Sequence, residues 1–309
     1  MFQLDHTKGN MSLMRLAMPD RADIAFRFFH TSKVPKAVAV VLHGTGMHGG
    51  YYLPFARCLA NEGVQVALMD QRGHGLSGGE RGHIRRRMQY ADDLADCLAA
   101  VHDAHPLPLF ALAHSGAAAI LLKALPLLPA GLLSGIALLT PTFANDGALV
   151  RSDSAGKGRF DSLKYMLRPD AARPVEQSGD HNKMTFAYGK FLLAQILRLG
   201  TQRTVLTYRP PASREPPYGY SAAAVAGCMI GQLEHALARI SCPIFLATGD
   251  NDVFVHGAAV QTVLPWALAP DVPFSAVNFA DADHFTTLLR SVRHLGAWIL
   301  ANVTTGASR

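Results

Sequence analysis

The chain contains 309 residues, of which 49% are hydrophobic and 17% are charged, so it can bury a large core. No stretch of the sequence approaches the roughly 20 uninterrupted apolar residues of a membrane span, and the first ten residues lack the basic and apolar pattern of a secretory signal. We therefore expect a cytoplasmic protein.

The charged residues number 29 basic and 23 acidic, for a formal net charge of +6. The tight basic run at residues 85–87 is typical of a solvated face, and the alternative is a peripheral contact with an anionic membrane or an acidic substrate. The sequence has no recognisable nucleic-acid-binding module, so we expect no nucleic-acid partner. The four cysteines form no CxxC pair and lie in apolar surroundings, which favours buried reduced thiols over disulfides or a metal site.

Strand-like and helix-like patterns alternate along most of the chain. This alternation predicts the α/β fold class, with a mostly parallel central sheet and helices on both faces. The alternation stops after Pro141, and the segment that follows has loop signals around helical patterns at 186–199 and 222–237, with no buried-strand run. We therefore predict a core in two parts, residues 1–142 and 240–309, and a helical cap insertion at 143–239. The predicted strands cover residues 24–29, 37–42, 65–70, 109–113, 135–139, 244–248 and 274–279.

The first motif follows the predicted strand at 37–42, a continuous apolar run of the kind that is covered on both faces. The run opens directly into the sequence HGTG at 43–46. Its glycines let the backbone turn so that the N–H of Thr45 can face the same point as the N–H of Gly116, and two such donors would stabilise charge that develops on a substrate carbonyl. A glycine-rich turn can also hold a phosphate, but this one lacks the lysine and the spacing of a P-loop.

Ser115 lies between the predicted strand at 109–113 and an apolar helix pattern. A serine at a sharp strand-to-helix turn is presented at the tip of the turn, beside the free N–H groups of the helix, as a nucleophile requires. Ala113 and Ala117 stand where small residues are needed, because strand and helix cross closely there. The alternative is that Ser115 only caps a helix.

Two residues that could activate a serine follow in the chain. Asp252 lies in a polar turn after the predicted strand at 244–248, and His284 lies in a polar loop after the last predicted strand, which we expect to expose it. A hydroxyl needs an imidazole to accept its proton, and the imidazole needs a carboxylate to fix its tautomer and stabilise its positive charge. Ser115, Asp252 and His284 therefore form a candidate catalytic triad.

Three neighbouring residues compete for these roles. Asp250 and Asp283 are alternatives to Asp252, but we expect Asp250 to shape its turn and Asp283 to cap the following helix. His114 flanks Ser115, but it would point away from the tip of the turn, so we expect it to pack in the core.

Five motifs in order resemble one known family: HGTGMHGGYY (43–52), DQRGHGLSGGERG (70–82), AHSGA (113–117), GDND (249–252) and DADHF (281–285). Over residues 20–145 and 240–300 the chain resembles the monoacylglycerol lipase and lysophospholipase branch of the α/β-hydrolases, which includes serine aminopeptidase-like proteins. The resemblance implies the α/β-hydrolase fold, the triad above, and Thr45 and Gly116 as oxyanion donors. The chain departs from the family pattern in the two alanines of the elbow and in lacking a methionine after the serine.

The predicted function is hydrolysis of a carboxylic ester without a cofactor or metal, and the resemblance implies a lipid-like ester such as a monoacylglycerol or a lysophospholipid. An aminopeptidase, a lactonase or a carbon–carbon bond hydrolase with the same triad remains open, as does a non-catalytic binding protein of this fold. An aminopeptidase would need an anionic group in the cap, for which Glu176, Asp180 and Glu215 are available. The oligomeric state is left open. Apolar residues of the insertion that could line an acyl pocket are Phe160, Tyr165, Met166, Leu167, Met184, Phe186, Tyr188, Phe191, Leu192 and Ile196.

Overall fold

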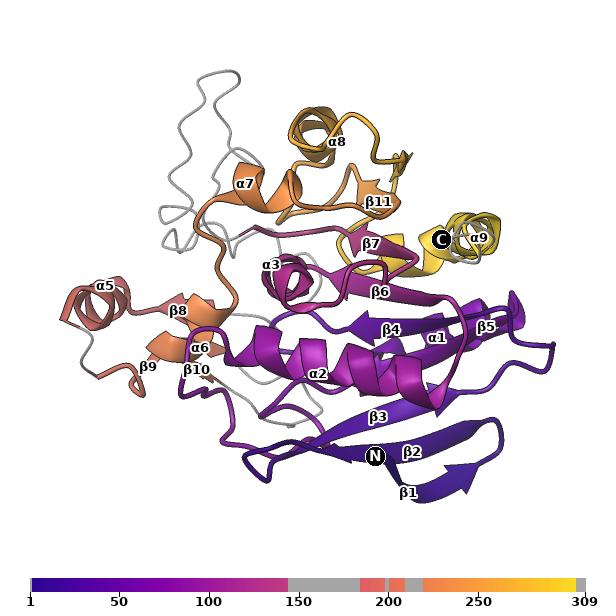
Figure 1. Cartoon of the computed structure of the whole chain (residues 1–309). Coiled ribbons are helices and arrows are strands. Elements are labelled where there is room, and N and C mark those ends of the chain that lie inside the picture. The colour runs from indigo at the N-terminus through magenta and orange to yellow at the C-terminus, as the bar shows by residue number, and fades with distance from the viewer. Residues whose placement is uncertain (1, 144–183, 198–199, 209–218, 304–309) are drawn as a thin grey trace.

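A nine-stranded sheet forms the centre of the computed structural model, which describes residues 2–143, 184–197, 200–208 and 219–303 (Figure 1). The strand order is β1-β2-β3-β5-β4-β6-β7-β11-β12. From β5 to β12 in this order neighbouring strands are parallel, whereas β1, β2 and β3 join in antiparallel pairs. The predicted α/β class with a mostly parallel sheet is confirmed. The strands are β1 (Phe2–Lys8), β2 (Met11–Ala17), β3 (Asp23–Phe29), β4 (Ala37–Leu42), β5 (Val64–Met69), β6 (Leu109–His114), β7 (Gly135–Leu139), β11 (Ile244–Gly249) and β12 (Phe274–Phe279).

The central strands are buried along their whole length, which explains their continuous apolar sequences. Every residue of β4, β5, β6, β7 and β11 is buried, because helices cover both faces of the sheet. On one face, Leu94 of α2 (Gln89–Ala104) and Leu121 of α3 (Ala117–Ala124) join the first apolar cluster, together with residues of α8 (Gly257–Trp266). On the other face, Leu59 of α1 (Leu53–Asn61) and Leu295 of α9 (Thr286–Ala301) join the second. Two short 3₁₀ helices, η1 (Gly49–Tyr52) and η2 (Leu125–Leu127), complete the described core.

Each of the seven predicted strands is present, with ends that differ from the prediction by at most one residue. The hairpin of β1 and β2 at one edge of the sheet was not predicted. Its first strand is largely exposed, so it has no run of apolar residues from which it could be recognised.

The described part of the insertion contains helices, as predicted, and also a three-stranded antiparallel sheet that was not predicted. Its elements are β8 (Met184–Phe186), α5 (Tyr188–Leu197), β9 (Thr204–Tyr208), β10 (Gly219–Ser221), α6 (Ala222–Gly227) and α7 (Leu233–Leu237). The helix predicted at 222–237 is two short helices, since the chain leaves the first at Gly227 and has another poor helix former, Gly231, in the connection. The bounds 143–239 of the insertion stay a prediction.

Hydrogen bonds join the insertion to the core at one end of the sheet, on the left in Figure 1. The N–H of Ser221 donates to the carbonyl of Gly82 at 2.9 Å. From the core, Lys123 Nζ donates to the carbonyl of Gly227 at 2.7 Å. Strand β10 is therefore fixed against the segment that follows β5, and helix α6 is fixed against helix α3.

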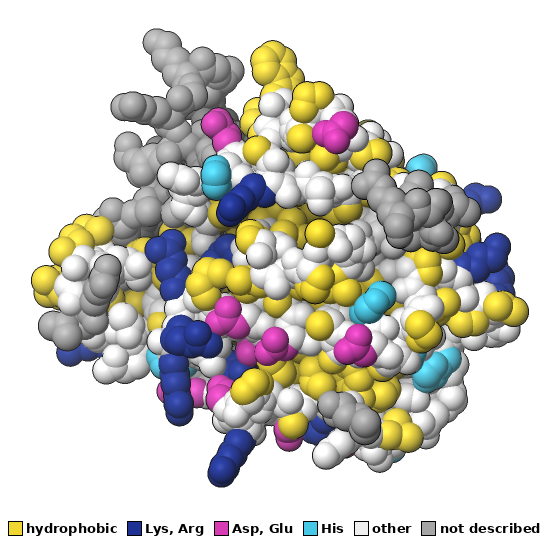
Figure 2. Space-filling model, viewed as in Figure 1, with side chains coloured by type: hydrophobic (Ala, Val, Ile, Leu, Met, Phe, Trp, Pro, Cys, Tyr) yellow, Lys and Arg dark blue, Asp and Glu magenta, His cyan; other side chains and the backbone are white. Residues whose placement is uncertain are grey.

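The surface viewed in Figure 2 mixes the two signs of charge, with Lys and Arg side chains interspersed among Asp and Glu. Arg85, Arg86 and Arg87 are exposed, and Arg86 pairs with Asp92 at 3.0 Å. Cys58 is also exposed, so the expectation that all four thiols are buried is wrong. Of the helices in the described ranges, none combines the length and the apolarity needed to cross a bilayer.

Candidate active site

Ser115 occupies a strained turn between β6 and α3. Its backbone φ is 55°, a left-handed value that a non-glycine residue adopts only at a cost. Two backbone hydrogen bonds hold the turn. The N–H of Ser115 donates to the carbonyl of Leu139 at 3.0 Å, and the backbone carbonyl of Ser115 accepts from the N–H of Ala118 at 3.1 Å. Helix α3 has Gly116 as its N-cap and no side-chain cap, so capping does not account for the serine. Ala113 and Ala117 are both buried, as expected at a close crossing of strand and helix.

The loop after β4 lies directly against this turn. A Cβ atom added to Gly44 would lie 3.2 Å from Ser115 Cβ, and one added to Gly116 would lie 2.5 Å from Thr45 Oγ1. Among the described residues, neither the N–H of Thr45 nor that of Gly116 makes a hydrogen bond. The two predicted oxyanion donors thus lie close together, and the described part of the chain supplies no hydrogen-bond partner to either N–H.

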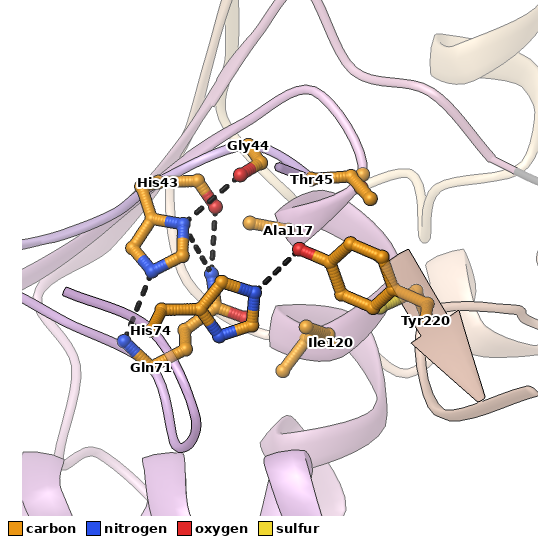
Figure 3. A pocket seen from close by; sticks show the side chains of 10 residues that line it. His43, Gly44, Thr45, Gln71, His74, Ala117, Ile120 and Tyr220 are labelled. Atoms are coloured by element: carbon orange, nitrogen blue, oxygen red, sulfur yellow. Dashed lines mark hydrogen bonds between the residues drawn. The ribbon is translucent and has the colours of Figure 1, made fainter. Parts of the chain in front are cut away.

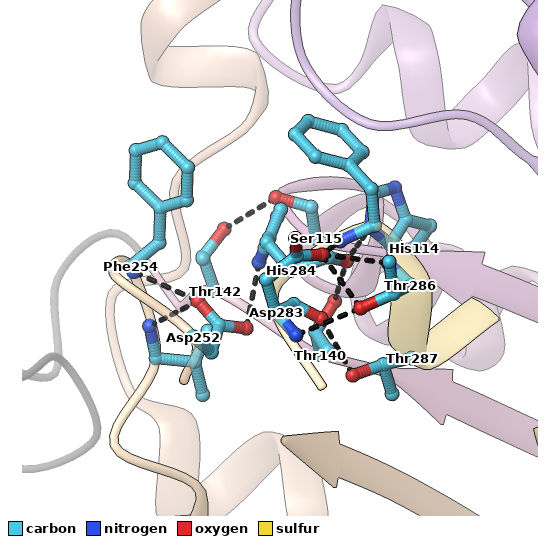
Figure 4. Close-up of polar contacts among 12 residues, drawn as sticks. His114, Ser115, Thr140, Thr142, Asp252, Phe254, Asp283, His284, Thr286 and Thr287 are labelled. Atoms are coloured by element: carbon cyan, nitrogen blue, oxygen red, sulfur yellow. Dashed lines mark hydrogen bonds and ion pairs between the residues drawn. The ribbon is translucent and has the colours of Figure 1, made fainter. Parts of the chain in front are cut away.

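Asp252 and His284 form a buried pair at the ends of β11 and β12 (Figure 4). His284 Nδ1 lies 2.8 Å from Asp252 Oδ2, and the side chains are 5% and 0% exposed. The other carboxylate oxygen, Oδ1, accepts from the N–H groups of Phe254 and Val255 at 2.8 and 2.9 Å. The polar loop therefore does not expose His284, contrary to the expectation from its sequence.

A close backbone approach brings these two loops together. A Cβ atom added to Gly249 would overlap the carbonyl of Ala282, so only glycine fits at the end of β11. Both competing carboxylates accept structural hydrogen bonds; Asp283 caps the following helix as predicted, whereas the bond of Asp250 goes to another strand and not to its own turn. Asp250 accepts from Asn278 Nδ2 at 2.8 Å, while Asp283 accepts from the N–H groups at the start of α9 at 2.9 and 2.7 Å.

His114 is buried as predicted, but it does more than pack. Its Nδ1 lies 2.6 Å from the hydroxyl of Tyr52, and its Nε2 lies 3.2 Å from the carbonyl of His284. Burial, followed by the neighbouring His284, holds the pKa of His114 well below its usual range, so the ring is neutral. Because a carbonyl can only accept, Nε2 carries the proton and Tyr52 donates to Nδ1. The hydroxyl of Thr140 donates to the same carbonyl of His284 at 3.3 Å. His114 and Thr140 together thus fix the backbone of His284.

The hydroxyl of Ser115 is partly exposed and lies 3.5 Å from Thr142 Oγ1, its one hydrogen-bond partner within the described part of the chain. Hydrogen bonds of catalytic groups often shorten only when substrate is bound, so the open geometry is compatible with proton transfer to His284. The sequence carried no local signal for Thr142, because this residue reaches the turn from the end of a different strand.

A narrow crevice adjoins Thr45 and Gly116 (Figure 3). It is lined by His43, Gly44, Thr45, Gln71, His74, Gly116, Ala117, Ile120, Tyr220 and Cys228. Among the cap residues expected near substrate, Leu192 and Ile196 of α5 are instead exposed, at 41% and 68%, and Phe191 is buried. The side chains of the remaining ones lie outside the described residues, as do Glu176, Asp180 and Glu215. In the described ranges no group of His, Cys, Asp or Glu is arranged to hold a metal ion.

Buried neutral histidines around the site predict a loss of stability in mild acid. Burial holds the pKa of His43 and His114 well below the usual range and lowers that of His74 to about 4. The contribution of these neutral histidines to stability is complete above pH 6.5. It is lost as the pH falls from 6.5 toward their pKa values in the folded protein, because in that range only the unfolded chain protonates them. Urea unfolding at pH 7, 6 and 5 should show the free energy of unfolding falling by about 1.4 kcal/mol per pH unit per histidine below pH 6.5.

The ordinary carboxyl pKa values lie near 4, so histidine titration dominates this window. His74→Asn should make the dependence shallower. A free energy of unfolding that stays constant from pH 7 to pH 5 would contradict the prediction.

Comparison with known proteins gives partial matches to one family and to several lipases. Residues 33–170 match the family described as serine aminopeptidase, S33. The chain is 37% identical over 82 residues to a monoacylglycerol lipase of Mycolicibacterium smegmatis, an alignment that covers 26% of this chain and 29% of the relative. It is 32% identical over 130 residues to the monoglyceride lipase of Homo sapiens, covering 42% of this chain and 43% of the relative. The chain thus aligns with less than half of the length of either relative.

Among solved structures, the monoacylglycerol lipase of Paleococcus ferrophilus superposes with a TM-score of 0.56 at 16% identity, covering 90% of this chain and 99% of the other. At this level of identity the match concerns the fold. The chain thus has the α/β-hydrolase fold, and in sequence it resembles monoacylglycerol lipases and the serine aminopeptidase family over part of its length.

Proposed function

We propose that the protein is a serine hydrolase that cleaves carboxylic esters through an acyl-enzyme intermediate. The observation that carries the proposal is the proximity of a strained serine turn, two N–H groups without a hydrogen bond among the described residues, and a buried His–Asp pair at 2.8 Å. Each part alone has a structural explanation. Together they supply a nucleophile, a base with an oriented tautomer and an oxyanion site.

In the proposed reaction, Ser115 Oγ attacks the ester carbonyl carbon while His284 Nε2 accepts its proton. Asp252 accepts from Nδ1 and stabilises the imidazolium that forms. The negative oxygen of the tetrahedral intermediate accepts hydrogen bonds from the N–H groups of Thr45 and Gly116. His284 then protonates the departing alcohol. A water molecule, deprotonated by the same histidine, cleaves the acyl-enzyme and releases the carboxylic acid.

The proposed substrates are lipid-like esters, such as a monoacylglycerol or a lysophospholipid. Support comes from the partial relatives, which are a monoacylglycerol lipase and a monoglyceride lipase. The apolar members of the crevice wall, Ala117 and Ile120, lie next to the oxyanion donors, where part of an acyl ester would be placed.

The test is a turnover profile of p-nitrophenyl esters of graded chain length, beside monoacylglycerols and aminoacyl amides. We expect hydrolysis of the esters and covalent labelling by a fluorophosphonate probe, because an activated serine attacks phosphorus as it attacks a carbonyl carbon. Amides cleaved faster than every ester would favour a peptidase. Absence of both labelling and turnover would favour a binding protein of the same fold.

A further inference from the structure

The loop that carries Thr45 is held by two tyrosine hydroxyls, one on each side. The N–H of Gly44 donates to Tyr52 Oη at 2.8 Å, and the N–H of Gly46 donates to Tyr220 Oη at 2.7 Å. Tyr52 belongs to the core and follows the loop closely in sequence. Tyr220 belongs to β10 of the insertion, 174 positions from Gly46. The core therefore holds one side of the loop and the insertion holds the other.

The hydroxyl of Tyr220 has a defined direction. Its side chain is buried, and Oη is hydrogen-bonded to His74 Nε2 (Figure 3). His74 Nδ1 lies 2.8 Å from the carbonyl of Arg72, so Nδ1 carries the proton of the ring. Burial lowers the pKa of His74 to about 4, which leaves Nε2 as an acceptor at neutral pH. Tyr220 thus accepts from Gly46 and donates to His74.

This chain of hydrogen bonds ends in a fixed part of the core. Arg72 Nε and Nη2 donate to the two carboxylate oxygens of Asp93, both at 2.6 Å, and Nη1 lies 2.7 Å from Asp20 Oδ2. Both Arg72 and Asp93 are buried. A bidentate pair of this kind keeps the guanidinium plane in place. It therefore also fixes the backbone of Arg72, whose carbonyl accepts from His74 Nδ1.

The backbone of the loop needs such a constraint. Met47 N–H donates to the carbonyl of Gly44 at 3.2 Å, which closes a four-residue turn, and Gly46 has φ of 78°. His43 Nδ1 holds the carbonyl of Gly44 at 2.9 Å, which directs the N–H of Thr45 to the opposite side of that peptide. The next peptide, between Thr45 and Gly46, can rotate readily because glycine adopts φ of either sign. In this loop the hydrogen bond to Tyr220 opposes that rotation.

We propose that Tyr220 is a positioning residue for the oxyanion site: it holds the peptide that follows Thr45, while His43 holds the peptide that precedes it, so that together they fix the position of Thr45 and its N–H. The inference rests on the proposed serine hydrolase function. Through Tyr220, the insertion would set the position of an N–H group that stabilises the transition state.

The test is Tyr220→Phe, which keeps the ring and removes the hydroxyl. We expect kcat for a p-nitrophenyl ester to fall about 10-fold, with KM changed less than about twofold, because only the transition state uses the Thr45 N–H. The affinity for an arylboronic acid, whose serine adduct is tetrahedral, should fall by a similar factor. Rates are normalised to the number of serines that react with a fluorophosphonate, so that loss of folded protein does not lower kcat.

Tyr90→Phe is the matched control. Tyr90 is a buried tyrosine of α2 whose hydroxyl has no hydrogen-bond partner among the described residues, so this variant should keep the parent kcat. His74→Asn is a second variant, which removes the acceptor of Tyr220 but leaves its hydroxyl in place. It should lower kcat by a smaller factor, and it carries the test if Tyr220→Phe fails to fold.

Parent kcat per titrated site in both Tyr220→Phe and His74→Asn would overturn the inference and leave the proposed function standing. A lower kcat with unchanged boronate affinity would also overturn it. A parent protein that neither labels nor hydrolyses esters would overturn the proposed function, and the inference with it.

Discussion

Replacing Ser115 with alanine is expected to lower ester turnover by a factor on the order of 10⁴ to 10⁶ and to abolish covalent labelling by a fluorophosphonate. The hydroxyl is the nucleophile of the proposed mechanism, and no neighbouring group replaces it. Thr142 Oγ1 is 3.5 Å from Ser115 Oγ but lies at the end of a different strand. Turnover of a p-nitrophenyl ester and the mass of the probe-treated protein measure the two effects.

Ser291→Ala is the matched control for this substitution. Ser291 is buried in α9, where its hydroxyl donates to the carbonyl of Leu288 in the same helix at 2.8 Å. This variant should label and hydrolyse as the parent does. If the Ser115→Ala protein still takes up the probe at the parent rate, another residue is the nucleophile and the strained turn has a different purpose.

The central sheet could be predicted because burial on both faces demands continuous apolar runs. β4, β6 and β7 have such sequences. Each run is only five or six residues long, which is typical of a strand and too short for a helix. The edge hairpin and the short strands of the insertion lack this signal. β8 and β10 are three residues long, and the pairing that makes them strands is set by other segments of the chain.

The candidate site could be located from short turns, and its supporting contacts could not. Ser115, Asp252 and His284 each follow a predicted strand, and the parallel sheet brings such strand ends to one edge. Tyr220 and Thr142 have no sequence pattern, since their contacts with the site depend on how distant segments pack. Tyr52 lay within a recognised motif, but its bond to His114 depends on the orientation of two buried rings.

Asp252→Asn is expected to lower kcat by about 10⁴-fold with little change in thermal stability. Because Oδ1 of this side chain accepts from the N–H groups of Phe254 and Val255, the amide oxygen of asparagine will take that position. The amide nitrogen then faces His284 Nδ1 and donates to it. The histidine is forced into the tautomer with the proton on Nε2, which cannot accept the proton of Ser115. Steady-state kinetics and a thermal melt on the same samples separate this effect from unfolding.

Asp250→Asn is the control, two residues away in the same turn. Asp250 is exposed and accepts from Asn278 Nδ2, and an asparagine side chain keeps an oxygen for that bond, so kcat should stay within about twofold of the parent. The effect of Asp252→Asn should also depend on the presence of the nucleophile. Added to Ser115→Ala, Asp252→Asn should lower the residual kcat almost no further, because the two residues act as a unit. A large loss of kcat in Asp250→Asn, together with a small loss in Asp252→Asn, would assign the role of the acid to Asp250 and not to Asp252.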